Sequence, residues 1–160
     1  MCRLICRVCH SCTKVTHHTS QISYLIPNLH QMQFKHIIGQ EAVKQRLIST
    51  VKDNRVSHAQ LLLGPEGSGS LALAVAYAQY LSCEDKQPHD SCGVCSSCRK
   101  YEKLVHPDLH FSYPFFAKDK NDTALSFIEQ WREAFLANPY LSLDLWRGYL
   151  DAENKQANIN

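Results

Sequence analysis

The sequence predicts an α/β fold in which helices cover a mainly parallel sheet. An apolar run, Ala59 to Leu63, ends at a glycine-rich turn, which is typical of a buried strand entering a tight loop. The following residues 70–81 are rich in strong helix formers. A second strand pattern covers residues 108–113, after a break at Pro107. Strands that alternate with helices in this way indicate a parallel sheet.

Two further segments have the periodicity of amphipathic helices. In residues 40–54 the apolar side chains recur at intervals of three and four residues, at Val43, Leu47, Ile48 and Val51. In residues 123–137 the same stripe is formed by Leu125, Ile128, Trp131 and Phe135, and Asn138-Pro139 ends it. A shorter helix is expected shortly before Pro107. The sequence contains no internal repeat.

Composition places the chain among globular proteins of a single domain. It has 160 residues, of which 44% are apolar and 20% are charged. No apolar run reaches the roughly eighteen residues of a membrane span, and no N-terminal stretch suits a secretory signal. We therefore expect a cytoplasmic protein without membrane contact. A net charge of +2 without a basic face argues against direct binding of nucleic acid.

The second of two cysteine clusters has the spacing of a metal site. In a reducing compartment, tight cysteine clusters indicate metal binding before disulfides. Eight, two and two residues separate the four ligand candidates Cys83, Cys92, Cys95 and Cys98. Four thiolates suit zinc in a closed, tetrahedral, structural site. An iron–sulfur cluster and free thiols are the alternatives, but the proline that usually follows a ferredoxin cysteine run is absent.

The first cysteine cluster lies in residues 1–31, which lack helical or alternating periodicity. Its members are Cys2, Cys6, Cys9 and Cys12, and "CRVCH" at 6–10 matches the haem c attachment pattern. Haem attachment requires export, and no export signal precedes the motif. A second methionine, Met32, stands just before the pattern becomes regular. We therefore interpret residues 1–31 as a disordered or spuriously translated extension.

The turn "GPEGSG" at 64–69 has the outline of a phosphate-binding loop without its chemistry. A working loop has the form G-x-x-x-x-G-K-[ST], in which lysine contacts phosphate and the hydroxyl holds Mg²⁺. Here Ser70 and Leu71 take those two positions. Losing one charge-assisted contact to phosphate costs about 1.5–3 kcal/mol, and leucine cannot coordinate a metal. The candidate loop residues Gly64, Gly67, Gly69 and Ser70 are thus predicted to be non-functional; an ordinary glycine turn is the alternative.

Four motifs in this order resemble the N-terminal part of bacterial DNA polymerase III clamp-loader subunits, which are members of the AAA+ superfamily. They are "FKHIIGQEAVKQRL" (34–47), "SHAQLLLGPEGSGS" (57–70), the cysteine module of 83–98 and "HPDLHF" (106–111). Together they span most of residues 32–113. The resemblance implies that residues 32–160 form the N-terminal part of a P-loop-type AAA+ core with an inserted zinc module.

The altered glycine loop points to one branch of this family. Gamma/tau subunits resemble true ATPases with an intact lysine and hydroxyl, whereas delta prime subunits commonly have a degenerate loop. The resemblance thus implies a delta prime-like part of the polymerase holoenzyme, without catalysis of its own. Its implied partners are the gamma/tau and delta subunits and, indirectly, the sliding clamp and primed DNA. In ATP-using relatives the segment that matches Ile37 to Gln40 lies near the adenine.

Some features of the family do not occur in this sequence. The Walker B strand, the sensor motif and the Ser-Arg-Cys arginine-finger motif are absent before Asn160, so we expect a chain truncated before Walker B. Neither Arg132 nor Arg147 is assigned as an arginine finger, and residues 114–160 match no motif. Two alternative functions stay open: a gamma/tau-like ATPase, and an autonomous zinc module that binds nucleic acid.

Overall fold

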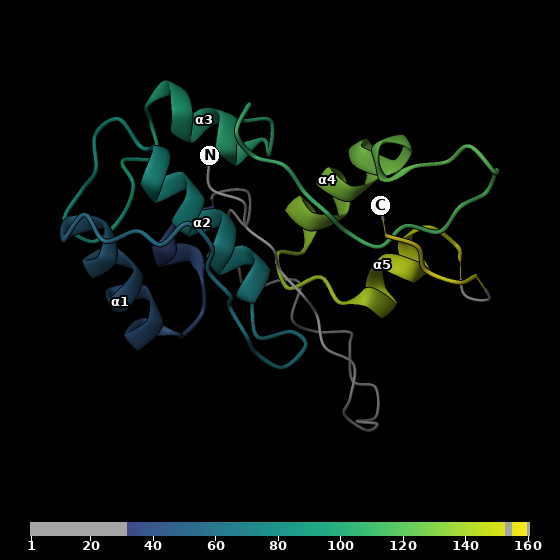
Figure 1. The fold of residues 1–160 in the computed structure, drawn as a ribbon, viewed down its shortest axis with the longest axis horizontal. Coiled ribbons are helices and arrows are strands. Elements are labelled where there is room, and N and C mark those ends of the chain that lie inside the picture. Colours follow the sequence, from purple (N-terminus) through teal and green to yellow (C-terminus); the bar gives the residue numbers. More distant parts are fainter. Residues whose placement is uncertain (1–31, 153–154, 160) are drawn as a thin grey trace.

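A computed structural model describes residues 32–152 and 155–159, so residues 1–31 and their four cysteines lie outside the described residues. The described part is helical (Figure 1). Its elements are η1 (Phe34–His36), α1 (Glu41–Lys52), α2 (Ser70–Ser82), α3 (Ser96–Glu102), η2 (Ala124–Phe127), α4 (Ile128–Ala137) and α5 (Leu143–Tyr149). The helices predicted over 40–54, 70–81 and 123–137 are confirmed as α1, α2 and η2 with α4. The shorter helix expected before Pro107 is α3, and α5 was not predicted.

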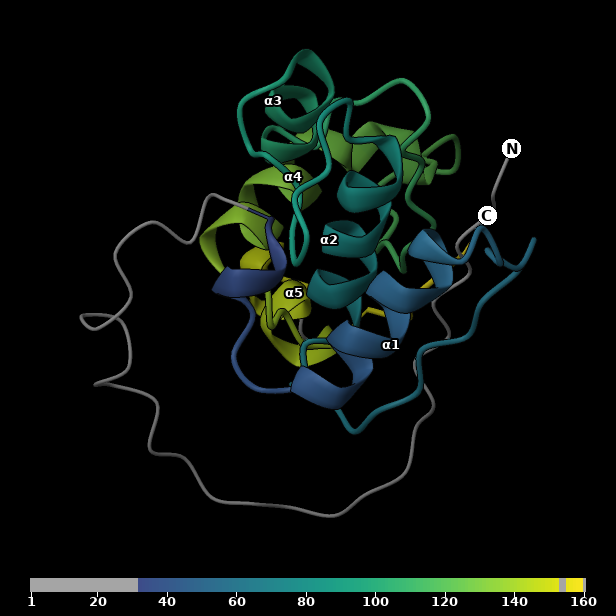
Figure 2. The same ribbon diagram turned by 90° about the vertical axis from the view of Figure 1, so that its left-hand side faces the viewer.

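Helix α2 lies at the centre of the first half of the molecule. Nine consecutive residues, Ala72 to Tyr80, are buried, because η1, α1 and α3 pack against different sides of the helix (Figures 1 and 2). A helix that is apolar on every side is expected to be buried in this way. The four alanines among these residues let neighbouring backbones approach closely.

The buried side chains form two cores that meet beside α2. The first core surrounds α2 and includes Phe34, Leu47, Ile48, Tyr101 and Phe135. The second is aromatic and joins α4 to α5; it includes Tyr113, Phe116, Phe127, Trp131 and Trp146. The side chains that pack against both cores are Leu71, Phe111 and Leu141. These three side chains therefore connect the two halves of the structure.

The predicted parallel sheet is wrong for the described residues. Neither 59–63 nor 108–113 belongs to a strand, and Leu61 and Leu63 are 60% and 73% exposed. The one β-interaction among the described residues is an antiparallel bridge between Phe115 and Asn158. A strand depends on a neighbour that satisfies its backbone N–H and C=O groups. No described segment pairs with either run, so neither apolar pattern forms a strand.

None of the helices in the described ranges is both long and apolar enough to cross a bilayer.

Replacement of Phe135 by alanine should destabilise the whole described fold. Phe135 is fully buried and its ring stacks on that of Trp131 at 6.3 Å, so it supports both cores. We expect Phe135→Ala to lower the free energy of unfolding by about 3–5 kcal/mol, measured by denaturant titration. The control Leu125→Ala removes a side chain that is 78% exposed and should change it by less than about 0.5 kcal/mol. Equal effects of the two substitutions would contradict this account of the core.

Candidate metal centre and glycine loop

The four predicted cysteine ligands come together in one cluster. The Sγ atoms of Cys83, Cys92, Cys95 and Cys98 all lie within 4.8 Å of one another. The distance between the Sγ atoms of Cys92 and Cys98 is 3.9 Å. Zinc–sulfur bonds of about 2.3 Å in tetrahedral geometry place sulfur atoms about 3.8 Å apart. The spacing of the thiols therefore fits a single four-coordinate ion.

Two helix ends and a tight turn position these thiols. Cys83 follows the last turn of α2, while Cys95 caps the N-terminus of α3 and Cys98 lies in its first turn. Gly93 has a φ of +75°, which lets the chain turn between Cys92 and Cys95. The sulfurs of Cys83, Cys92 and Cys95 accept N–H bonds from Cys92, Cys95 and Cys98 at 3.3–3.4 Å. Donors arranged in this way stabilise negative charge on sulfur.

Burial and hydrogen bonds shift the pKa values of these thiols in different directions. Burial raises the pKa of Cys83 and that of Cys98 above the ordinary thiol value. Burial also opposes ionisation of Cys95, but hydrogen bonds from the backbone N–H groups of Cys98 and Glu84 outweigh it and lower the pKa to about 7. A buried cluster of thiolates needs compensating positive charge. The donor set therefore fits a thiolate-bound metal ion.

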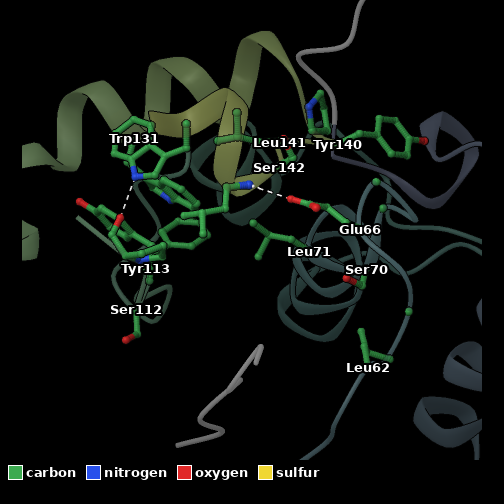
Figure 3. A pocket seen from close by; sticks show the side chains of 18 of the residues that line it. Leu62, Glu66, Ser70, Leu71, Ser112, Tyr113, Trp131, Tyr140, Leu141 and Ser142 are labelled. Carbon is green, nitrogen blue, oxygen red and sulfur yellow. Dashed lines mark hydrogen bonds between the residues drawn. The ribbon is translucent and has the colours of Figure 1, made fainter. Parts of the chain in front are cut away.

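The predicted glycine loop also takes the expected position, at the N-terminus of α2. Gly67 and Gly69 both have a φ of +77°, and Gly69 is the residue before the first turn of α2. Ser70 is the first helical residue. All four predicted loop residues line one cavity of about 600 Å³. Figure 3 shows Tyr113 and Trp131 across this cavity from Glu66 and Ser70.

The cavity offers little to a phosphate. Among the described residues that line it, Glu66 is the only charged side chain, and its charge is negative. Leu71, which occupies the position of the metal-holding hydroxyl, packs against both cores. The backbone and the helix N-terminus still favour an anion, but no cation assists them. Ser70 and Leu71 thus place no basic side chain in the described lining of this cavity.

Residues 138–143 bind the glycine loop from within the chain, a contact that the sequence analysis missed. Glu66 Oε1 accepts a hydrogen bond of 3.0 Å from the backbone N–H of Leu143, at the N-terminus of α5 (Figure 3). The Tyr140 hydroxyl accepts one of 2.8 Å from the N–H of Ile38. A Cβ atom at Gly69 would lie only 2.6 Å from the Tyr140 ring, so glycine is required there. Helix α5 itself had a sequence signal in its N-cap Ser142.

The two arginines that the sequence analysis did not assign as fingers have contacts within the fold. Arg132 Nε donates a hydrogen bond of 3.0 Å to the carbonyl oxygen of Leu104. Arg147 pairs with Asp144 at 3.1 Å, and its guanidinium lies 5.5 Å from the centre of the Phe116 ring. Arg132 therefore connects α4 to the first core, whereas the contacts of Arg147 lie within the second half of the structure.

The ordered motifs, the glycine loop and the four-cysteine module together define a clamp-loader subunit of the AAA+ type. The profile of the family described as "DNA polymerase III, delta subunit" matches residues 39–144, and the chain belongs to this family. No solved structure matches the chain significantly.

Curated relatives agree with this family. "DNA polymerase III subunit delta'" of Escherichia coli is 32% identical over 89 residues, which are 56% of this chain and 26% of the relative. The Bacillus subtilis protein of the same name is 33% identical over 75 residues, 47% and 22%. "DNA polymerase III subunit tau/gamma" of Haemophilus influenzae is 34% identical over 76 residues, 48% and 11%. The chain therefore spans about a quarter of the length of the delta' relatives.

Removal of one thiol should release one metal ion. In Cys98→Ser, the loss of a buried ligand should lower the metal content by one ion per chain, measured by elemental analysis, and should lower the melting temperature. The matched control is Ser96→Ala, because Ser96 lies in the same C-x-x-C segment but is exposed and outside the sulfur cluster. An unchanged metal content in Cys98→Ser would contradict the assignment of these four residues as ligands.

Removal of the Glu66 carboxylate should loosen α5. We expect Glu66→Ala to lower the free energy of unfolding by about 0.5–1.5 kcal/mol, because the N–H of Leu143 loses its acceptor. Glu66→Gln retains a side-chain oxygen and should lose less than Glu66→Ala in the same denaturant titration. If both variants unfold like the parent chain, the contact between Glu66 and Leu143 does not contribute to stability.

Proposed function

We propose that this chain is a delta prime-type subunit of the bacterial DNA polymerase III clamp loader, which assists ATP-driven loading of the sliding clamp onto primed DNA. The observation that carries the proposal is the pair Ser70 and Leu71 at the start of α2, in the positions of the catalytic lysine and the Mg²⁺-binding hydroxyl. In this proposal the chain itself does not hydrolyse ATP. It contributes to the assembly as a rigid partner of subunits that do.

Electrostatics at the loop supports this division of labour. Phosphoryl transfer depends on cations that stabilise the charge developing on the transferred group. The described cavity residues supply no cation, and Glu66 adds a negative charge beside the loop. An ATP molecule bound at this loop would lack the contact from a lysine and the hydroxyl that holds its Mg²⁺. The degenerate loop is therefore proposed to have kept its backbone shape without its catalytic role.

We propose zinc as the metal of the cysteine centre. A zinc ion held by Cys83, Cys92, Cys95 and Cys98 would have no free coordination position, so it would supply structural cross-linking rather than catalysis. Binding of this type contributes on the order of 10–16 kcal/mol of coupled folding free energy. That contribution would stabilise the loop between α2 and α3, in which residues 84–89 are all exposed.

The proposed assembly follows from the family. Residues 32–160 would form the N-terminal part of an AAA+ domain, with residues 83–98 as a zinc module inserted after the phosphate-loop helix. The proposed partners are the gamma/tau and delta subunits, and the proposed location is the cytoplasm. Tagged gamma/tau subunit from the same source should retain the full protein on an affinity column, and a failure to do so would contradict the proposed partnership.

A gamma/tau-type ATPase is the second candidate. It is favoured by the tau/gamma relative, whose identity to this chain is as high as that of the delta' relatives. Ser70 and Leu71 argue against it, because a gamma/tau-type loop needs a lysine and a hydroxyl at these positions.

Phosphate release from Mg-ATP distinguishes the two candidates. We expect the purified chain to show no steady ATP turnover and no nucleotide binding in the micromolar range by calorimetry. Ser70→Ala is the matched control, because it changes the lysine position without introducing charge, and it should behave like the parent chain. Steady turnover by the parent chain that Ser70→Ala reduces would overturn the delta prime assignment and support the ATPase.

A further inference from the structure

The loop of the cysteine centre also holds the first described residues of the chain. One carboxylate, that of Asp90, accepts hydrogen bonds from two consecutive backbone N–H groups at the start of η1. These bonds come from Phe34 at 3.1 Å and from Lys35 at 3.0 Å. Asp90 precedes the ligand candidate Cys92 by two residues. A carboxylate at the N-terminus of a helical turn is a charge-assisted cap.

A buried polar network next to Asp90 repeats this connection. Gln33 Nε2 donates to the carbonyl oxygen of Ser91 at 2.6 Å, and Gln79 Nε2 of α2 donates to the Ser91 hydroxyl at 2.9 Å. Gln33, Gln79 and Ser91 are each at most 4% exposed. A Cβ atom on Gly93 would lie 2.9 Å from Gln33 Nε2, so the Gln33 side chain packs directly on the metal-binding turn. Buried polar groups that lose such partners are strongly destabilising.

The position of Asp90 depends on how the loop is closed. Residues 84–95 contain no helix or strand, and the loop has few apolar anchors of its own. Within it, the N–H of Gln87 donates to the carbonyl oxygen of Asp90 at 2.9 Å. Ordering a segment of this kind is opposed by the conformational entropy of each residue. A metal bound to thiols on both sides of Asp90 would supply the restraint that the loop lacks.

We propose that the metal centre restrains residues 33–38, and that Asp90 is the positioning residue that links metal occupancy to the order of η1. The inference rests on the zinc ion of the proposed function and adds a conformational role to it. Metal loss releases the cap on Phe34, whose side chain is 2% exposed and lies 5.7 Å from the Tyr80 ring on α2. The N-terminal segment then separates from the first core.

Release of η1 also affects the glycine loop. After η1, Lys44 Nζ donates to the carbonyl oxygen of Ile37 at 2.7 Å, and the N–H of Ile38 donates to Tyr140, whose ring packs on Gly69. Residues 33–38 therefore bridge the metal centre at one end of α2 and the glycine loop at the other. Metal occupancy is therefore expected to determine how well ordered residues 33–38 are.

Amide hydrogen exchange in the zinc-bound full chain tests the proposed restraint on η1. Asp90→Ala removes both acceptors, so we expect exchange at the Phe34 and Lys35 amides to increase about tenfold, with unchanged zinc content. The matched control is Asp85→Ala, because Asp85 is an exposed carboxylate of the same loop that accepts a hydrogen bond from Gln87. It should change exchange at the same two amides by less than about twofold.

Removal of zinc by a chelator provides the second measurement. It should increase exchange at Phe34 and Lys35 in the parent chain, while the interior amides of α4 stay protected. Absence of zinc from the purified chain would overturn the proposed metal and the proposed restraint on η1 together. If zinc is bound but its removal leaves exchange at Phe34 and Lys35 unchanged, the proposed restraint on η1 alone is overturned. Loss of protection in α4 as well would show general destabilisation and also overturn it.

Discussion

Burial of helix α2 on all sides is the constraint on which the rest of this structure depends. Its small side chains allow η1, α1 and α3 to pack close to one axis, and the first core forms around it. The glycine loop ends at the first residue of α2, and Cys83 follows the last. The geometry of both candidate sites is therefore fixed by one rigid helix. A change in how α2 is packed would move the thiols and the glycine loop together.

Local patterns in the sequence were sufficient for most of the helices and for the thiol cluster. Apolar periodicity predicted α1 and α4, richness in helix formers predicted α2, and the spacing of Cys83 to Cys98 predicted a thiol cluster that the structure brings together. The sheet could not be predicted in the same way. An apolar run such as 59–63 specifies an extended, hydrophobic backbone, but strand pairing also requires a neighbour, and a neighbour is a property of the tertiary structure.

The contacts that connect the sites were not predictable from spacing either. Glu66 and Leu143 are 77 residues apart in the sequence, and Asp90 and Phe34 are 56 apart. Such pairs join a single side chain to a backbone group, so they leave no periodicity and no motif. The Glu66 carboxylate adds a negative charge to the glycine loop, which the sequence alone shows. Its role as a hydrogen-bond acceptor for the N-terminus of α5 depends on a helix that lies far along the sequence.

Side chains in and directly after the glycine loop make contacts with the rest of the described chain. Leu71, at the motif position of the hydroxyl residue, is partly buried and packs against both cores, so the apolar surface that it removes from water stabilises the fold. Glu66 accepts a hydrogen bond from the backbone N–H of Leu143 within the chain. A working loop must leave its amides, its lysine and its hydroxyl free for a ligand. Here Glu66 and Leu71 join the two halves of the structure, which suits the rigid partner proposed above.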